Sequence, residues 1–389
     1  MKKRKLLSLA LAFALVLTTA FAGAEGIFAG TVSDANGIQA TEITAQSANS
    51  NEEITPYIAK MTTGSDNTAI VAVTVTKKGT LAIPLSGVEV GEGVTVTLHS
   101  TSAATSGDKI GYSKRLSSSN VEDTLYAKVA KAGTYYLKFE TASYSAGTPQ
   151  SVGFGAILYP AGGTLTKGKV FYGASPDNSG VSYYKVTAPG NGYLTVSFPE
   201  RLTDYSSFNI KLMNSRKNSL FTNFEYLSSS KAYKTTIGVA KGTYYIAVKN
   251  SDNAYGIKVS FTSVKESSGS SRSKAKSITK GSTKKGIITA AQSESSGDWY
   301  KFKVTKTQYV KFTFKVKANG GGSSGGLKAA FYQSGKTYPA TSVNCYGENG
   351  KEVQLYTYGK GNKLAPGTYY IKVQKYSHGN GYYTLKWNK

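Results

Sequence analysis

The sequence has 389 residues, a formal net charge of +25 and a single cysteine, Cys345. One cysteine excludes an intramolecular disulfide, so apolar burial alone must hold the cores. We expect Cys345 to be a half-buried packing residue rather than a reactive thiol or an intermolecular link. The only histidines, His99 and His378, lie far apart in the chain, which disfavours both a clustered zinc site and a His-based catalytic centre.

The N-terminus has the three parts of a secretory signal. Lys2–Lys5 are basic, Leu6–Phe21 are apolar, and Ala22–Ala24 supply small residues for cleavage. The apolar run is shorter than the roughly 20 residues of a spanning helix, although a retained anchor is the alternative. We therefore expect residues 1–24 to be a cleaved signal peptide. The protein would then be secreted and extracellular, either free or held non-covalently on the cell wall.

Residues 25–55 differ in composition from the rest of the chain. They carry five acidic residues and no basic one, and they are rich in Ser, Asn, Ala and Thr. Because no hydrophobic periodicity is sustained, we expect a disordered N-terminal segment.

From residue 56 onward, short alternating runs separated by turn residues predict strands and no helix. In the first module, 56–160, these runs are Ala69–Val75, Leu81–Leu85, Val94–Leu98, Thr124–Ala130 and Val152–Leu158. In the second, 161–265, they are Gly168–Tyr172, Tyr183–Val186, Tyr193–Phe198, Phe208–Met213, Lys234–Val239 and Tyr255–Phe261. In the third, 274–389, they are Gly286–Thr289, Trp299–Val304, Tyr309–Val316, Leu327–Tyr332, Glu352–Tyr358 and Tyr382–Trp387. Residues 266–273 predict a flexible linker by composition.

One motif marks each module. Gly-Thr-Tyr-Tyr occurs at Gly133–Tyr136, Gly242–Tyr245 and Gly367–Tyr370, each time after a polar turn and before alternating residues. Since side chains alternate across a strand, the first tyrosine is expected inside and the second outside. The pattern predicts an all-β fold of three tandem antiparallel β-sandwiches, jelly-roll-like in kind.

The third module resembles the bacterial pre-peptidase C-terminal domain. The matching stretches are Ala275–Ile278 with Gly281 and Gly286, Ser296–Val304 (SGDWYKFKV) and Leu364–Val373 (LAPGTYYIKV). Val181–Val186 matches more loosely in the second module, and Ala69–Val75 in the first lacks the aromatic pair.

That family consists of small β-sandwiches appended to secreted proteases, and clostridial collagenases carry related collagen-binding domains. The resemblance implies a non-catalytic binding module. Calcium-binding relatives use a cluster of acids near the first strands, whereas this chain offers only the single acids Asp66, Asp177 and Asp298. Because calcium needs several carboxylates, we expect no metal and no cofactor, with these three as weak candidates only.

Positive charge increases toward the C-terminus. Residues 56–160 carry +2, residues 161–265 carry +8 and residues 266–389 carry +16. Such charge attracts polyanions, although it also serves solubility. The candidate contacts are the basic run Arg272, Lys274, Lys276, Lys280, Lys284 and Lys285 and the aromatic residues Tyr136, Tyr245, Tyr370 and Trp387.

These observations together predict a secreted, non-catalytic binding or adhesion protein. Its partner would be an anionic cell-wall polymer, a glycan or an extracellular matrix protein, with nucleic acid bound only non-specifically. Two alternatives stay open: a secreted hydrolase or peptidase with an unrecognised site, and a self-associating structural component of a matrix.

Overall fold

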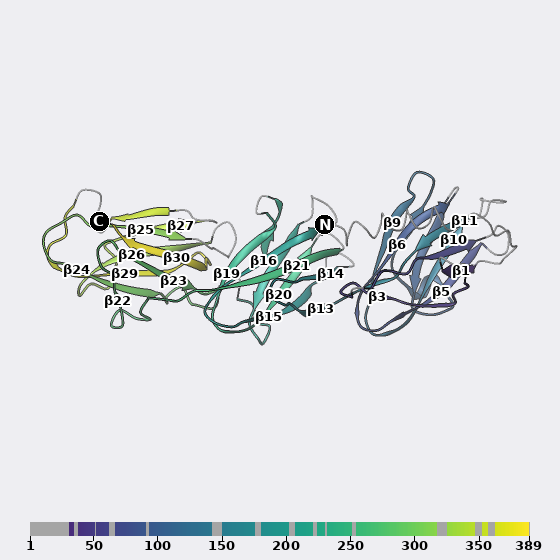
Figure 1. Ribbon diagram of the computed structural model, residues 1–389, viewed down its shortest axis with the longest axis horizontal. Helices are drawn as coiled ribbons and strands as arrows, with labels where there is room; N and C mark the ends of the chain where they lie inside the picture. Colours follow the sequence, from purple (N-terminus) through teal and green to yellow (C-terminus); the bar gives the residue numbers. More distant parts are fainter. Residues whose placement is uncertain are drawn as a thin grey trace.

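Six sheets, arranged as three consecutive sandwiches, make up the computed structural model (Figure 1). It describes residues 31–34, 38–50, 52–61, 67–90, 93–141, 150–175, 180–201, 207–220, 224–229, 232–250, 254–316, 325–346, 352–356 and 362–388. Within these segments every regular element is a strand, apart from the short 3-10 helix η1 (Ser106–Asp108). Among the described residues, no helix is long and apolar enough to span a membrane. The expected signal peptide, residues 1–24, lies outside the described residues.

Module 1 contains a seven-stranded and a five-stranded sheet. Its strands are β1 (Thr31–Asp34), β2 (Glu42–Thr44), β3 (Gln46–Ser47), β4 (Tyr57–Met61), β5 (Thr68–Val75), β6 (Gly79–Glu89), β7 (Val94–His99), β8 (Lys109–Leu116), β9 (Glu122–Val129), β10 (Gly133–Thr141), β11 (Gln150–Phe154) and β12 (Ile157–Pro160). The larger sheet has the order β1-β4-β11-β6-β12-β3, with β9 also paired to β6, and the smaller has the order β2-β5-β10-β7-β8.

Module 2 contains a five-stranded and a four-stranded sheet. Its strands are β13 (Gly162–Thr164), β14 (Val170–Ala174), β15 (Ser182–Ala188), β16 (Gly192–Arg201), β17 (Phe208–Met213), β18 (Glu225–Leu227), β19 (Lys234–Val239), β20 (Gly242–Asn250) and β21 (Ala254–Ser263). The sheet orders are β13-β15-β20-β17-β18 and β14-β21-β16-β19.

Module 3 repeats the arrangement of module 2. Its strands are β22 (Lys276–Ser277), β23 (Thr283–Ile288), β24 (Asp298–Val304), β25 (Lys311–Val316), β26 (Gly326–Gln333), β27 (Thr341–Tyr346), β28 (Glu352–Tyr356), β29 (Gly367–Tyr376) and β30 (Gly381–Trp387). The sheet orders are β22-β24-β29-β26-β27 and β23-β30-β25-β28.

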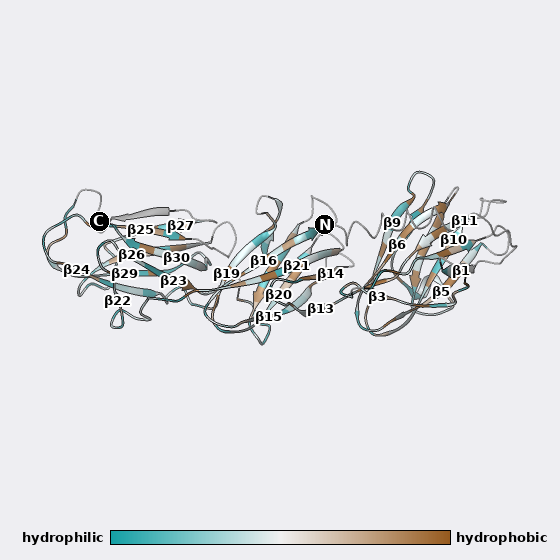
Figure 2. Ribbon diagram, viewed as in Figure 1, coloured by the Kyte–Doolittle hydropathy of each residue, from teal (hydrophilic) through white to brown (hydrophobic). Residues whose placement is uncertain are grey.

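Each module has its own main apolar core between its two sheets. Along the strands, apolar and hydrophilic side chains alternate (Figure 2), so that one face of each sheet is buried. On β10, for example, Leu137 and Phe139 are fully buried while Lys138 between them is not. Burying one such apolar side chain contributes roughly 2–3 kcal/mol. The predicted all-β sandwich class is confirmed.

The Gly-Thr-Tyr-Tyr strands β10, β20 and β29 are the central strands of the three five-stranded sheets. In each, the hydroxyl of the first tyrosine donates a hydrogen bond to the carbonyl four residues earlier. The bonds are Tyr135 Oη to Lys131 O (3.0 Å), Tyr244 Oη to Ala240 O (3.0 Å) and Tyr369 Oη to Ala365 O (2.9 Å). This geometry resembles the tyrosine corner of other sandwiches. The motif thus fixes the turn that leads into the central strand.

The expected disorder of residues 25–55 is wrong for the described part of that segment. β1 pairs with β4, β2 pairs with β5, and β3 pairs with β12. Asn49 also links module 1 to module 2, because its amide accepts from Tyr172 N–H (2.8 Å) and donates to Tyr172 O (2.9 Å). The strands are two to four residues long, too short to show a periodicity in sequence.

The expected flexible linker at residues 266–273 is also wrong. Gly269 exchanges two backbone hydrogen bonds with Trp299 (2.8 and 3.0 Å), and Ser267 N–H donates to Lys285 O (3.1 Å). Composition predicted flexibility because the segment has few apolar side chains, but its backbone hydrogen bonds attach it to module 3.

Candidate ligand-binding surface

Aromatic and basic side chains gather on the outward face of the five-stranded sheet of module 3. In the central strand Tyr370 is opposite Lys301 on one side and Tyr332 on the other. Lys372, two residues on, is opposite Trp299. We define the module 3 face as Arg272, Trp299, Lys301, Lys328, Tyr332, Tyr370 and Lys372. No Asp or Glu lies among the described outward side chains of β24, β26 and β29.

Arg272 is held over this sheet by the chain segment that was expected to be flexible. Its guanidinium carbon lies 4.5 Å from the ring centre of Tyr370 and 5.9 Å from that of Tyr332. Nη1 donates to Lys336 O and Nη2 to Gln333 O, both at 2.5 Å. These bonds and the cation–π contacts fix the guanidinium in place before any ligand arrives.

Trp299 and Lys372 form the other half of the module 3 face. The rings of Trp299 and Tyr332 are 5.2 Å apart, and Lys372 Nζ lies 5.7 Å from the Trp299 ring centre while donating to Ser295 O (2.7 Å). Burial, and next the charge of Lys328, lower the pKa of Lys372. An anion placed here would relieve both effects, because it compensates the desolvated ammonium.

Module 2 presents a related surface at the same register. Lys185 is opposite Tyr245, as Lys301 is opposite Tyr370. Lys217 Nζ lies 5.3 and 5.2 Å from the ring centres of Tyr183 and Tyr245. We define the module 2 face as Tyr183, Lys185, Lys211, Lys217, Phe224, Tyr226 and Tyr245, and again no described outward side chain of β15, β17 or β20 is acidic.

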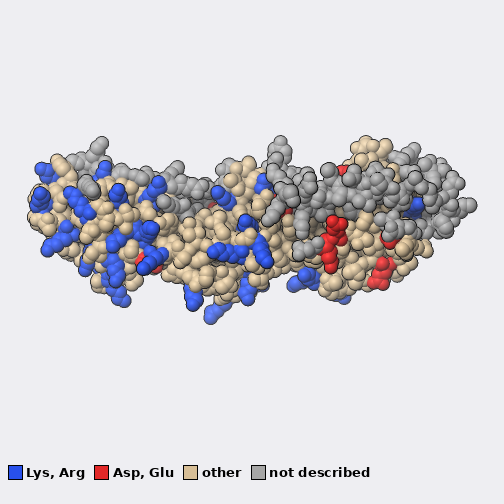
Figure 3. Space-filling model, in the orientation of Figure 1, with Lys and Arg blue, Asp and Glu red and all other residues tan. Residues whose placement is uncertain are grey.

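Module 1 differs from modules 2 and 3 at the outward positions of β5, the strand beside the central strand. Ile70 and Ala72 occupy the positions of Trp299 and Lys301, as their pairing with the central strand shows. Tyr136 is half-buried there, but Lys138 beside it is paired with Glu140 (3.1 Å). In the view of Figure 3, basic side chains are spread over modules 2 and 3, while acidic side chains are more prominent toward module 1.

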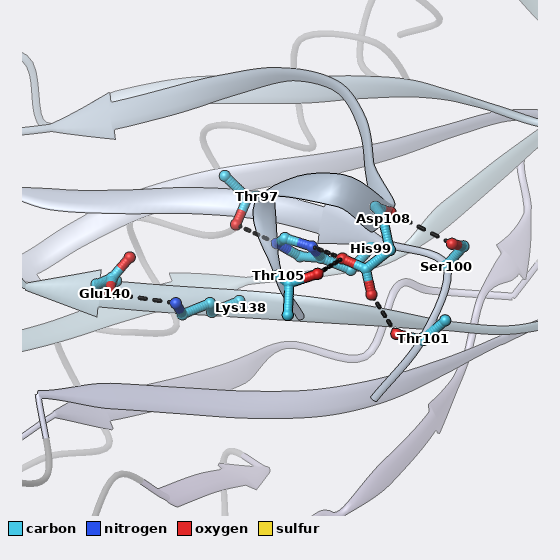
Figure 4. A network of polar contacts seen from close by, with 8 residues as sticks. All are labelled: Thr97, His99, Ser100, Thr101, Thr105, Asp108, Lys138 and Glu140. Carbon is cyan, nitrogen blue, oxygen red and sulfur yellow. Dashed lines mark hydrogen bonds and ion pairs between the residues drawn. The ribbon is translucent and has the colours of Figure 1, made fainter. Parts of the chain in front are cut away.

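His99 of module 1 belongs to a polar network on that outward face (Figure 4). Its Nδ1 lies 2.8 Å from Asp108 Oδ1, and its Nε2 lies 2.8 Å from Thr97 Oγ1. Thr101 and Thr105 also donate to Asp108, and the pKa of this carboxyl is lowered, first by the Thr101 hydrogen bond. The order hydroxyl, imidazole, carboxylate resembles a hydrolytic triad.

The network also has a structural role, because it joins the end of β7 to the loop that follows it. His99 is 3% exposed, and the loop that carries Thr101 and Asp108 folds over it. The other histidine, His378, lies exposed in the turn between β29 and β30, 3.9 Å from Glu294.

Asp298 occupies a polar cleft of about 720 Å³ between modules 2 and 3, which Glu266, Lys274 and Lys276 also line. The hydroxyl of Tyr383 donates a hydrogen bond to Asp298 Oδ2 (2.5 Å). The hydroxyl oxygens of Tyr300 and Tyr383 are hydrogen-bonded to each other at 2.8 Å. Burial raises the pKa of Asp298 to about 7, with the charge of Glu266 adding to the effect.

Two carboxylates beside two lysines do not fit calcium, and the described residues contain no group of three metal-ligating side chains. The other two candidates, Asp66 and Asp177, lie outside the described residues.

The predicted basic run does not form one patch. Arg272 belongs to the module 3 face, Lys274 and Lys276 line the cleft, and Lys280 contacts Gln308 (Nζ to Oε1, 3.4 Å). Lys284 and Lys285 lie on β23, in the other sheet.

The prediction that Trp387 is a ligand contact is wrong, because this side chain is buried. It is 5% exposed, and its ring packs against Phe302 and Phe312 at 5.1 and 5.8 Å between centroids. The reason is alternation on β30, where Tyr383, Leu385 and Trp387 share the inward side. Cys345, expected half-buried, is fully buried in the same core.

Several residues of the two faces did not come out of the sequence reasoning, among them Trp299, Tyr332, Lys372, Tyr183 and Lys217. A signal for two of them was present: Trp299 and Tyr183 each stand directly before the tyrosine that enters the core, in DWYKF and SYYK. Tyr332 and Lys217 reach the faces through pairing and loop geometry, which one strand's pattern does not contain.

No family model matches the chain, and no curated protein sequence is similar to it. Among solved structures, the pre-peptidase C-terminal domain of collagenase from Bacillus anthracis is 21% identical over 32% of this chain and 98% of that chain, with a TM-score of 0.22. The tandem CBM22 domains of Paenibacillus barcinonensis Xyn10C are 7% identical over 87% and 86%, with a TM-score of 0.21. The M60 catalytic domain with two CBM51 domains from Clostridium perfringens ZmpB is 9% identical over 95% and 38%, with a TM-score of 0.20. Because all three TM-scores are this low, we base no function on these likenesses.

Proposed function

We propose that this chain is an exported, non-catalytic binding protein whose module 3 face binds an anionic polysaccharide. The observation that carries the proposal is the arrangement of Trp299 and Tyr370 with Arg272 and Lys372 on one side of the sheet, around Tyr332, which is only 8% exposed and supports them from below. Aromatic faces suit the apolar faces of sugar rings, and fixed cations suit carboxylate or sulfate groups. A cell-wall polymer or an acidic matrix glycan supplies both.

The aromatic rings distinguish this ligand from a general polyanion. A flexible polyol phosphate offers charge without sugar rings to stack, so it would use Arg272 and the lysines alone. Such binding is screened within about 8 Å at physiological salt. Ring stacking responds little to salt, so a mixed mechanism keeps part of its affinity when salt is raised.

The test is calorimetric titration of the mature protein with polygalacturonate, dextran sulfate, wall teichoic acid and neutral dextran at two salt concentrations. We expect the first two to bind, with part of the affinity retained at 0.5 M salt. Tyr370→Ala should weaken binding about tenfold, which is about 1.4 kcal/mol.

Tyr136→Ala is the matched control, because it removes the corresponding tyrosine from the central strand of module 1. Equal losses for the two variants, or binding only of teichoic acid and only at low salt, would contradict the proposal. Turnover of a polysaccharide by the purified protein would instead favour the hydrolase alternative, and concentration-dependent self-association would favour the matrix component.

A further inference from the structure

We infer that the module 2 face is a second site for the same anionic polysaccharide, and that modules 2 and 3 act as one two-site unit on a single polymer chain. The inference rests on the proposed function, which assigns only the module 3 face. Three observations support it: the chemistry of the module 2 face, the docking of the two modules, and the charge on both.

The module 2 face repeats the tyrosine–lysine pairing of the module 3 face, while Ala247 and Met213 stand at the positions of Lys372 and Tyr332. In each, the second tyrosine of the motif lies opposite a lysine, Lys185 or Lys301. An aromatic residue, Tyr183 or Trp299, lies two positions before that lysine. In module 2 the cation between the rings is Lys217, which comes from the loop after β17 and contacts both Tyr183 and Tyr245. Lys211, with Nζ 5.1 Å from the Phe224 ring centre, and the 54%-exposed Tyr226 extend this surface.

The two modules are docked rather than tethered. Gly238 of β19 donates its N–H to Asn380 Oδ1 (2.8 Å) and accepts from Ala290 N–H (2.8 Å). A Cβ at Gly238 would lie 2.3 Å from Ile288 O, so the two backbones approach as closely as only glycine allows. Ala290 itself packs into the core of module 2.

Side chains continue the contact beyond Gly238. Tyr193 stacks on Tyr382 across the junction, with ring centroids 5.9 Å apart. Because the segment after module 2 is hydrogen-bonded to Trp299, it fixes the module 3 face as well. The spacing of the two faces is therefore set by the fold.

A linear polyanion is the occupant that this arrangement fits. Both faces carry several cations and no described outward acid on their strands, so each favours a negatively charged segment. A flexible chain that leaves one face is held near the other, and linkage of this kind raises affinity by roughly 10²–10⁴. A short oligosaccharide occupies each face separately and gains nothing from the second.

In the experiment, isothermal titration calorimetry measures binding of the mature protein to polygalacturonate and, separately, to the galacturonate tetramer. We expect two tetramers to bind each protein molecule, and the long polymer to bind at least about 100-fold more tightly. The double variant Lys217→Ala/Tyr245→Ala should reduce the tetramer stoichiometry from two to one and abolish the gain from polymer length. Tyr370→Ala combined with Arg272→Ala should do the same from the other face.

Matched controls keep the outcomes separable. Tyr136→Ala should change neither stoichiometry nor affinity, and circular dichroism and thermal unfolding establish that every variant is folded. One tetramer per protein, lost only with the module 3 variant, would overturn this inference and leave the proposed function standing. Absence of polygalacturonate binding to the unmodified protein would overturn both.

Discussion

Modules 1 and 3 each contain a Gly-Thr-Tyr-Tyr central strand, a tyrosine corner and a sandwich architecture. They differ in the side chains that the strand beside the central one presents to solvent. Tyr136 and Tyr370 occupy the same position of that strand, but Tyr136 is opposite Ala72 whereas Tyr370 is opposite Lys301. The shared motif therefore serves the fold, since its first tyrosine makes the same hydrogen bond in both. The neighbouring strands decide whether the outer face can bind an anion.

Removing a corner tyrosine should have the largest effect, because it acts on what the modules share. Tyr135→Ala should cost module 1 about 3 kcal/mol, from lost burial and the cavity left behind. Tyr135→Phe removes only the hydrogen bond to Lys131 O and should cost about 1 kcal/mol. Urea unfolding of the three forms measures both. A similar cost for the outward Tyr136→Ala would contradict the assignment of the two tyrosines.

Modules 2 and 3 differ at the first residue of β15 and β24, which is Ser182 in module 2 and Asp298 in module 3. In module 2 the hydroxyls of Tyr184 and Tyr255 are hydrogen-bonded at 2.9 Å, as those of Tyr300 and Tyr383 are in module 3. Because the pKa of Asp298 is raised from 3.8 to about 7, the folded state holds a proton that the unfolded state has released between these values. The stability of module 3 should thus fall as pH rises from 4 to 7. The shift corresponds to about 4 kcal/mol at most.

Asp298→Asn tests this pH dependence. The charges facing Asp298 are Glu266, Lys274 and Lys276, with Tyr300 and Tyr383 behind it. Near pH 8 the variant should unfold at a higher temperature than the unmodified protein, and at pH 4 the difference should vanish. Parallel pH profiles of melting temperature for the two proteins would refute the idea that Asp298 carries the effect.

Much of the fold could be predicted from the sequence, because alternation in 69–75, 193–198 or 255–261 is a local property of one strand. The short strands β1–β3 and the docked segment 266–273 could not, since their order comes from backbone bonds to residues far along the chain. The same limit applied to the candidate site. Tyr370 and Arg272 were found separately, but their 4.5 Å contact and the burial of Trp387 are properties of packing.

The junction offers a smaller effect that sharpens the comparison between docked and independent modules. Asn380 is fully buried and accepts the N–H of Gly238. Asn380→Ala leaves that donor without this acceptor and should cost about 1–2 kcal/mol of docking energy. Faster proteolysis between modules 2 and 3 would be the readout, with Asn388→Ala at the chain end as the control. Unchanged cleavage would mean that Gly238 and the Tyr193–Tyr382 stack suffice.

The smallest expected effect is a gain, obtained by giving module 1 the outer residues of module 3. Ile70 is 41% exposed and pairs with Lys138, just as Trp299 pairs with Lys372. Ile70→Trp with Ala72→Lys therefore places an aromatic ring and a cation at the register of Trp299 and Lys301. Glu140→Gln removes the carboxylate that pairs with Lys138.

The triple variant should bind one additional polygalacturonate tetramer, with an affinity several-fold weaker than that of module 3. The weakness has a physical cause, because the three substitutions add no counterpart of Arg272, whose guanidinium lies close to the rings of Tyr332 and Tyr370. Cation–π contacts of this kind contribute about 0.5–1 kcal/mol at exposed sites. Calorimetric stoichiometry rising by one, while Ala72→Lys alone adds nothing, would show that the aromatic and basic residues work together. No gain in the folded triple variant would mean that register and residue type are insufficient, and that the guanidinium held by Gln333 and Lys336 is what separates the modules.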